Sequence, residues 1–230
     1  MQTNGSNITS WKQIARVIDH SMLKPDASLE DIKQVCEETI KYGFASLAVN
    51  PSVIPYCRKY LEGSDVVIDS SIGFPFGQNT IDTKVFEVRN ALSNGAKEID
   101  YVINIVELKA GYLKNVKEEM LRIKEAAGDF VVKAIIETCY LTQDEKKQMA
   151  ELCVESGLDF IKTSTGFSPG GATKEDVSLL NSIACGQVGV KAAGGMTSLD
   201  KVLTMLEAGA TRIGTKYSVK IIDEAKKMGL

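Results

Sequence analysis

The 230-residue sequence predicts an α/β fold, a closed (β/α)8 TIM barrel formed by a single domain, residues 1–230. Short β-type runs recur eight times in about 215 residues, and segments of helical periodicity separate them, which indicates parallel strands joined by helical crossovers. Eight such units close naturally into a barrel. A doubly wound open sheet is the competing architecture, but no G-x-G-x-x-G motif follows the first strand. The runs centre near Val17, Leu47, Ile68, Val102, Ala134, Ile161, Val190 and Ile213.

Helical periodicity is clearest in four segments between these runs. In the first of them, Ser28 is suited to cap the helix N-terminus and Asp31 lies in the first turn. Several of the segments end in glycine, the residue preferred just after a helix. The predicted helices are 28–43, 79–95, 142–157 and 197–209.

Composition and charge exclude several classes of function. The chain has 27 Lys+Arg against 30 Asp+Glu and no basic stripe, so we expect neither nucleic acid nor an anionic membrane as a partner. No apolar run approaches the ~20 residues of a membrane span, and the polar start MQTNGSNITS does not resemble a secretory signal. Five widely spaced cysteines without C-x-x-C indicate free thiols in a reducing compartment, and we expect a cytoplasmic protein. One histidine, His20, cannot build a His-rich zinc site, which leaves only a cation held by carboxylates open.

Charged residues lie within four of the expected strands. Side chains alternate between the two faces of a strand, and the opposite faces are more uniformly apolar, so we expect the charged faces inside the barrel. Buried charges are costly unless paired or used, and a structural ion-pair network is the simpler interpretation. Catalysis is favoured for the set because barrel active sites lie at the carboxyl ends of strands. The residues are Asp100, Lys133, Glu137, Lys162 and Lys191.

Two lysines on consecutive strands predict covalent carbonyl chemistry. A lysine amine attacks a carbonyl only when neutral, so its pKa must fall from ~10.4, and burial or a neighbouring cation lowers it. Lys162 and Lys191 stand on consecutive strands, which would run ~5 Å apart, and one would be the Schiff-base nucleophile and the other its cationic neighbour. The spacing leaves open which one attacks, and Asp100 would move protons or order a water. Small residues at Gly189 and Ala193 are expected to leave space beside Lys191.

Three glycine-bearing loops follow the last three strands, at 164–173, 192–197 and 214–218. Backbone N–H groups in such loops bind phosphate, and the loops after strands seven and eight are the usual place in a barrel. Lys216 would add a positive charge there. The candidate binding residues are Gly170, Gly171, Gly194, Gly195, Gly214 and Lys216.

At these residues the sequence closely resembles the deoxyribose-phosphate aldolases, a family of class I aldolases, from about residue 16 to 216. The motifs that carry the resemblance include IDHSMLKP (18–25), EIDYVIN (98–104), KTSTGFSPGGAT (162–173) and VGVKAAGG (188–195). The resemblance implies a (β/α)8 barrel and reversible cleavage of 2-deoxy-D-ribose 5-phosphate to D-glyceraldehyde 3-phosphate and acetaldehyde in deoxyribose phosphate catabolism. It implies no cofactor and no metal.

The resemblance also assigns roles that spacing alone leaves open. Lys162 matches the Schiff-base lysine of the family, Lys191 the second lysine and Asp100 the proton-relay aspartate. Asp19 and Lys24 match polar residues near the substrate. The expected partners are therefore the sugar phosphate and acetaldehyde, and a homodimer is one possible assembly.

The sequence departs from the family pattern at four places. Ala48 stands where the family often has Cys, and Asp69-Ser70 where it commonly has Cys-Thr, so an inward-pointing Asp69 would alter the charge of the pocket. The last loop reads GTKYS in place of G-T-S-S-G, with Lys216 as a compensating charge, and Pro169 removes one N–H donor. Two alternatives therefore stay open: a sugar-phosphate isomerase or epimerase without covalent lysine chemistry, and a non-catalytic sugar-phosphate binder.

Overall fold

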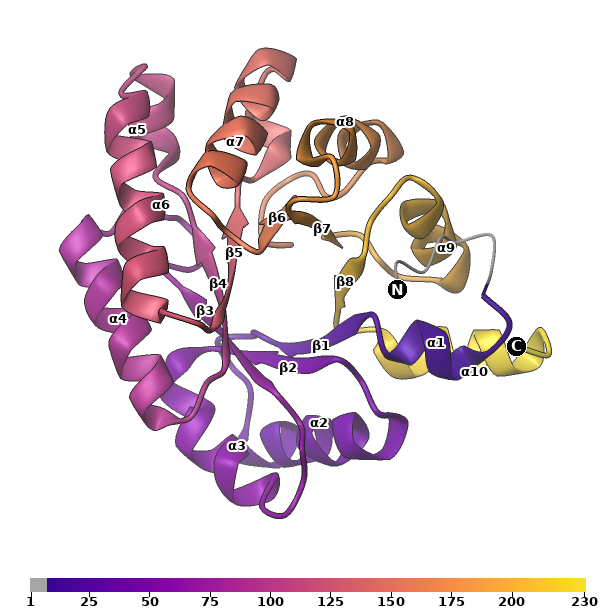
Figure 1. The fold of residues 1–230 in the computed structure, drawn as a ribbon. Helices are drawn as coiled ribbons and strands as arrows, with labels where there is room; N and C mark the ends of the chain where they lie inside the picture. The colour runs from indigo at the N-terminus through magenta and orange to yellow at the C-terminus, as the bar shows by residue number, and fades with distance from the viewer. Residues whose placement is uncertain (1–7) are drawn as a thin grey trace.

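Eight short parallel strands pair in chain order and close on themselves, because β8 pairs with β1. The computed structural model describes residues 8–230, so most of the polar start considered above lies outside the described residues. The closed barrel confirms the predicted fold and excludes the open sheet (Figure 1). The strands are β1 (Ile18–Met22), β2 (Ser46–Val49), β3 (Ile68–Ile72), β4 (Glu98–Val102), β5 (Val131–Ile135), β6 (Phe160–Lys162), β7 (Gly189–Ala193) and β8 (Arg212–Thr215).

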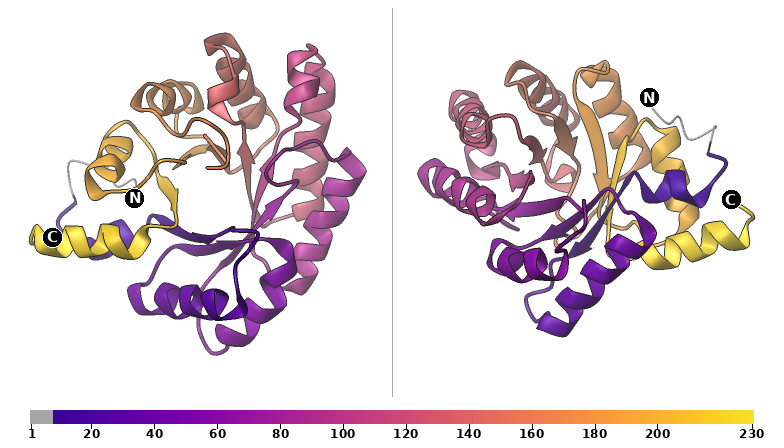
Figure 2. Two further views of the ribbon diagram at one scale, coloured as in Figure 1. Left: turned by 180° about the vertical axis from the view of Figure 1, so that it is seen from behind. Right: turned by 60° about the horizontal axis from the view of Figure 1, so that its bottom comes forward.

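Helices surround the barrel on the outside, and the two further views show the same ring (Figure 2). All four predicted helices are confirmed, each within two residues of its expected ends. Among the residues that the structure describes, none of the helices is long and apolar enough to cross a membrane. The helices are α1 (Trp11–Ala15), α2 (Leu29–Tyr42), α3 (Ile54–Tyr60), α4 (Ile81–Asn94), α5 (Ile105–Lys109), α6 (Leu113–Ala127), α7 (Gln143–Glu155), α8 (Lys174–Ala184), α9 (Leu199–Glu207) and α10 (Ser218–Lys227), with short 3-10 turns η2 (Pro51–Val53) and η3 (Thr138–Tyr140).

Local sequence signals account for the helix ends. The Ser28 hydroxyl accepts a hydrogen bond from the Asp31 amide, and the Asp31 carboxylate accepts one from the Ser28 amide, which makes a reciprocal capping box. At the other end of α2, Gly43 adopts a left-handed φ of 66°, a conformation that glycine reaches without steric cost.

The strand pleat separates an apolar layer from a charged interior. Ile99 and Tyr101 are fully buried in the apolar core under the helices, whereas Asp100 between them contacts lysines of the barrel interior. The predicted division of faces is therefore confirmed for β4. The charged side chains in the barrel interior are shielded from water, and they pair with one another instead.

A buried ion pair ties two helices to the carboxyl end of β4. Lys84 of α4 lies 2.5 Å from Glu119 of α6, and its ammonium also donates to the Val102 carbonyl at 2.8 Å. Glu119 in turn accepts from the Asn104 amide at 3.0 Å. The pair satisfies backbone groups where β4 ends, two residues beyond Asp100.

Candidate active site

A cavity of about 220 Å³ opens at the carboxyl ends of the strands. Both predicted lysines, Lys162 and Lys191, line it together with residues of the loops after β1, β6, β7 and β8. Ala193 lines it as expected, and Ala48 of β2 forms part of the wall. The cavity therefore lies where the barrel fold places its active sites.

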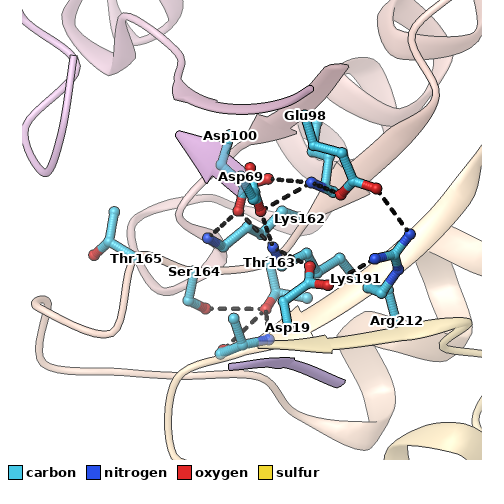
Figure 3. Close-up of polar contacts among 12 residues, drawn as sticks. Asp19, Asp69, Glu98, Asp100, Lys162, Thr163, Ser164, Thr165, Lys191 and Arg212 are labelled. Carbon is cyan, nitrogen blue, oxygen red and sulfur yellow. Dashed lines mark hydrogen bonds and ion pairs between the residues drawn. The ribbon is translucent and has the colours of Figure 1, made fainter. Parts of the chain in front are cut away.

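Eight charged side chains from seven of the strands pair with one another beneath this cavity. All of them except Lys133 are labelled in Figure 3. Four are cations and four are carboxylates, so the cluster is neutral when every group is ionised. We call this set the ion cluster. Its members are Asp19, Asp69, Glu98, Asp100, Lys133, Lys162, Lys191 and Arg212.

Strand register brings the predicted catalytic groups together. Lys162 and Lys191 are direct register partners of β6 and β7, as expected from their places on consecutive strands. Asp100 is the register partner of Lys133 on the β4–β5 side of the interior. The backbone hydrogen bonds of the sheet therefore place the two lysines side by side on adjacent strands.

Asp100 is the shared acceptor of three lysines. Its Oδ2 atom lies 2.6 Å from the Nζ atoms of both Lys162 and Lys191, and Oδ1 lies 2.9 Å from Nζ of Lys133. Burial raises the pKa of this carboxyl, but Lys133, Lys162 and Lys191 override burial and hold the pKa well below its usual range. Asp100 is therefore an anion that bridges the two amines.

The surroundings of the two amines differ in the number of carboxylates. Lys191 contacts Asp19 at 2.5 Å and Asp69 at 3.0 Å in addition to Asp100. Burial lowers the pKa of Lys191, but these three carboxylates raise it above its usual range. Among the carboxylates of residues 8–230, Lys162 contacts Asp100 alone, and burial together with the charge of Lys191 lowers its pKa. Lys162 is thus the amine that most readily becomes neutral.

Lys133 fits the structural interpretation of the buried charges. Its ammonium is fully buried and lies 2.7 Å from Glu98 and 2.9 Å from both Asp69 and Asp100. Glu137, the other charge expected inside this strand, lies beyond its end with a left-handed φ of 51°. There it accepts hydrogen bonds from the amide and the hydroxyl of Thr165, which lines the cavity.

Two members of the ion cluster were not predicted. Arg212 at the start of β8 donates to Asp19 at 2.7 Å and contacts Glu98 at 3.4 Å. Glu98 precedes Asp100 by two residues, so the alternation that placed Asp100 inside also identifies Glu98. Arg212 is the first residue of the short strand β8, and no alternation of charged and apolar residues in that strand predicts that its side chain points inward.

Three carboxylates form the one grouping of potential metal ligands among the described residues. Oxygen atoms of Asp19, Asp69 and Glu98 all lie within 4.8 Å of one another. Each of these carboxylates is already paired with Lys133, Lys191 or Arg212. The protein's own cations therefore balance the charge that a metal ion would meet there.

The predicted binding residues divide into two groups. Residues that line the cavity are Lys24, Gly194, Gly195, Gly214 and Lys216. Asp19, Gly170 and Gly171 do not line it.

Asp19 lies below the cavity, where it pairs with Lys191 and Arg212. A Cβ atom at Gly171 would lie 2.4 Å from the Gly194 carbonyl oxygen, and one at Gly170 would lie 2.5 Å from Cβ of Cys139. These two glycines allow close packing behind the loops, rather than direct contact with a ligand in the cavity.

The expectation of free space beside Gly189 is wrong. A Cβ atom there would lie 2.5 Å from the ring of Phe160, so the neighbouring strand already fills this volume. The glycine makes room for an aromatic ring at the amino end of the barrel, not for substrate.

A closed parallel barrel with a low-pKa lysine, a second lysine and a bridging aspartate beneath an open cavity defines an enzyme of the class I aldolase type. The family model of the DeoC/LacD aldolases matches residues 14–229. The chain belongs to this family.

Curated relatives and solved structures agree with the family. A deoxyribose-phosphate aldolase of Caldanaerobacter subterraneus subsp. tengcongensis is 49% identical over 224 residues, which cover 96% of this chain and 97% of the relative. One of Streptococcus uberis is 50% identical over 218 residues, or 94% and 99% of the two chains. The tetrameric deoxyribose phosphate aldolase of Aeropyrum pernix superposes with a TM-score of 0.89 at 29% identity, covering 99% of this chain and 97% of that one.

Proposed function

We propose that the chain is a class I aldolase that reversibly cleaves 2-deoxy-D-ribose 5-phosphate to D-glyceraldehyde 3-phosphate and acetaldehyde, with Lys162 as the Schiff-base nucleophile. The observation that carries the assignment of Lys162 is the unequal pairing of the two amines. Lys191 has three carboxylate partners and stays charged, whereas Lys162 has one, and burial lowers its pKa. Both family membership and the relatives support the substrate.

The neutral Lys162 amine attacks the C1 aldehyde of the open-chain sugar, and loss of water leaves a protonated imine. A base then removes the proton of the C3 hydroxyl, and the C2–C3 bond breaks. This bond separates the two carbons that become acetaldehyde from the three that become glyceraldehyde 3-phosphate. The bonding electrons move through C2 and C1 to the imine nitrogen, and glyceraldehyde 3-phosphate leaves. Protonation of the enamine at C2 and hydrolysis release acetaldehyde and the free amine.

Asp100 and Lys191 supply the proton transfers in this proposal, through a water in the cavity. Asp100 lies 2.6 Å from each amine, so it can accept a proton from one lysine while the other stays hydrogen-bonded. The amides of Gly194, Gly195 and Gly214, together with Lys216, would hold the phosphate, since all four residues line the same cavity.

Borohydride trapping with acetaldehyde tests the proposal. We expect a reduced adduct on Lys162 by peptide mass mapping, and none in the Lys162→Arg variant. The Lys174→Arg variant is the matched control because Lys174 is an exposed residue at the start of α8 that does not line the cavity. An adduct on Lys191 would reverse the two lysine roles, and a folded wild-type protein without any adduct would favour a non-covalent isomerase or a binder.

We further propose that the chain acts as one catalytic domain in the cytoplasm and that it self-associates, a homodimer being the smallest assembly. The free state of all five cysteines supports a reducing compartment. The tetramer of the Aeropyrum pernix protein supports self-association. Sedimentation velocity at micromolar concentration tests the assembly, and a monomer throughout would contradict it.

A further inference from the structure

Asp69 is a buried carboxylate for which the proposed mechanism has no role. Its Oδ2 atom accepts from the ammonium groups of Lys133 at 2.9 Å and Lys191 at 3.0 Å. Its Oδ1 atom is buried and has no hydrogen-bond partner among the described residues. In Figure 3, Asp69 lies beside Asp100, directly against the two groups that the proposed mechanism uses for proton transfer.

Charge balance requires a destination for the proton that Lys162 loses. The ion cluster is neutral when all eight groups are ionised, and release of that proton to solvent would leave a net negative charge buried in the barrel. Buried net charge is strongly disfavoured. Transfer of the proton to a carboxylate of the same cluster makes Lys162 neutral and keeps the cluster neutral.

Asp69 is the carboxylate best placed to receive that proton. Asp100 is held by three lysines, and Asp19 is held by Lys191 and Arg212; despite burial, these cations lower the pKa of both carboxyls.

The carboxyl of Asp69 faces Lys133 of β5 and Lys191 of β7, but also Asp100 and Glu98 of β4 and Asp19 of β1. Burial and the neighbouring negative charges of Asp100 and Asp19 outweigh the lysines and raise its pKa to about 6.

We propose that Asp69 is the internal proton store of the active site, which holds the proton of Lys162 while the amine is neutral and returns it when the imine forms. This proposal rests on the proposed function. The path follows three hydrogen bonds: Lys162 to Asp100 at 2.6 Å, Asp100 to Lys191 at 2.6 Å and Lys191 to Asp69 at 3.0 Å.

Each group along the path exchanges one proton. Lys162 gives a proton to Asp100, Lys191 gives one to Asp69, and Asp100 passes its proton to Lys191. Lys191 and Asp100 end as they began, Lys162 is neutral and Asp69 is a carboxylic acid. Attack on an aldehyde and loss of water then consume the stored proton, which leaves a charged imine and an ionised Asp69. Asp69 does not line the cavity and reaches the amine only through Lys191 and Asp100, so it is a positioning residue for the proton.

Infrared difference spectroscopy on addition of acetaldehyde at pH 5.5, where a carboxyl with a pKa of about 6 is mostly protonated, tests the proposal in the wild-type protein. We expect loss of a carboxylic acid C=O band as the imine forms, with a shift of that band when aspartate is labelled with ¹³C. The band loss is absent in the Asp69→Asn variant and retained in Ser71→Ala, which removes a buried hydroxyl two residues along on the same inward face. Imine formation without loss of an aspartic acid band would overturn the proposal.

Proton counting with an indicator dye in weak buffer gives a second readout. The wild-type protein should take up no proton as the imine forms, because Asp69 supplies it. Asp69→Asn should take up one proton per imine from solvent, since a neutral Lys162 balances the charge of that variant. Equal uptake in the two proteins would overturn the proposal.

Borohydride trapping on the same samples separates the two proposals. If the wild-type protein forms no adduct, the proposed function fails and the proton store fails with it. If the adduct forms without loss of the band, the proton store alone fails. The labelled wild-type experiment does not depend on the folding of any variant.

Discussion

Removing one partner of the buried pair of Lys84 and Glu119 should lower the free energy of unfolding more than removing both. Both side chains are almost completely inaccessible, at 0% and 1% exposure. Glu119→Gln leaves the Lys84 ammonium buried with only the Val102 carbonyl as a partner, and breaking a buried pair in this way costs about 3–5 kcal/mol. For a chain of this size that is a decrease in Tm of roughly 6–20 °C.

Adding Lys84→Met to Glu119→Gln should restore stability. The glutamine oxygen still accepts from the Asn104 amide, so the double variant leaves two neutral groups, the Val102 carbonyl and the glutamine NH2, in place of the ammonium that both faced. A hydrogen bond between these two groups would leave at most one of them unsatisfied. One unsatisfied buried acceptor costs about 1–3 kcal/mol, which is roughly 2 kcal/mol less than the cost expected for the single variant. The double variant should therefore be more stable than Glu119→Gln alone. If the substitutions acted only by removing contacts, the double variant would be the less stable of the two.

Urea unfolding of the three proteins measures these differences through the midpoint, provided that the slope with denaturant is unchanged. A double variant less stable than Glu119→Gln would refute the reasoning, because the cost would then come from lost packing and not from an unpaired charge. A loss below about 1 kcal/mol in Glu119→Gln would refute it as well, since an unpaired buried ammonium costs more.

Three further predictions concern the barrel interior and its loops. Lys133→Met removes an ammonium that pairs with three carboxylates, which raise its pKa, and should destabilise the protein by about 3–5 kcal/mol. Lys162→Met removes an amine whose charged form burial disfavours, as its lowered pKa indicates, and should stabilise the protein by about 1 kcal/mol at pH 7 in thermal melts. Because the folded-state pKa of Lys162 is lowered, wild-type stability should rise as pH climbs from that pKa to the unfolded value of ~10.4, and Lys162→Met should lack this rise; a parallel rise in the variant would contradict the assignment. Gly171→Ala places a Cβ atom 2.4 Å from the Gly194 carbonyl oxygen, so it should raise KM for the sugar phosphate several-fold, and an unchanged KM would show that the loop after β7 accommodates the methyl group.

Patterns along single strands predicted the barrel and its charged interior well. Alternation within 97–104 separates Asp100 from Ile99 and Tyr101, and the structure places these residues on the expected sides. The adjacency of Lys162 and Lys191 followed from their positions on consecutive strands and is confirmed by their register. These features depend on local geometry, which the sequence carries directly.

Features that depend on several strands at once were beyond such patterns. The choice between Lys162 and Lys191 depends on how many carboxylates surround each amine, and Asp19 and Asp69 come from distant strands. The error at Gly189 has the same origin, because the volume it leaves is filled by Phe160 of the adjacent strand. Spacing within one segment carries no information about the side chains that another segment contributes.

The register of Lys162 with Lys191 fixes the two points at which these side chains leave the backbone. The sheet therefore keeps both lysines within reach of the same carboxylate, Asp100, whose Oδ2 atom holds the two amines. The reactivity of Lys162 therefore depends on the pairing of β6 with β7 and not on the loops. Changes in the loops at the carboxyl ends of the strands can therefore alter which aldehydes enter the cavity while the pair of lysines on β6 and β7 stays in place.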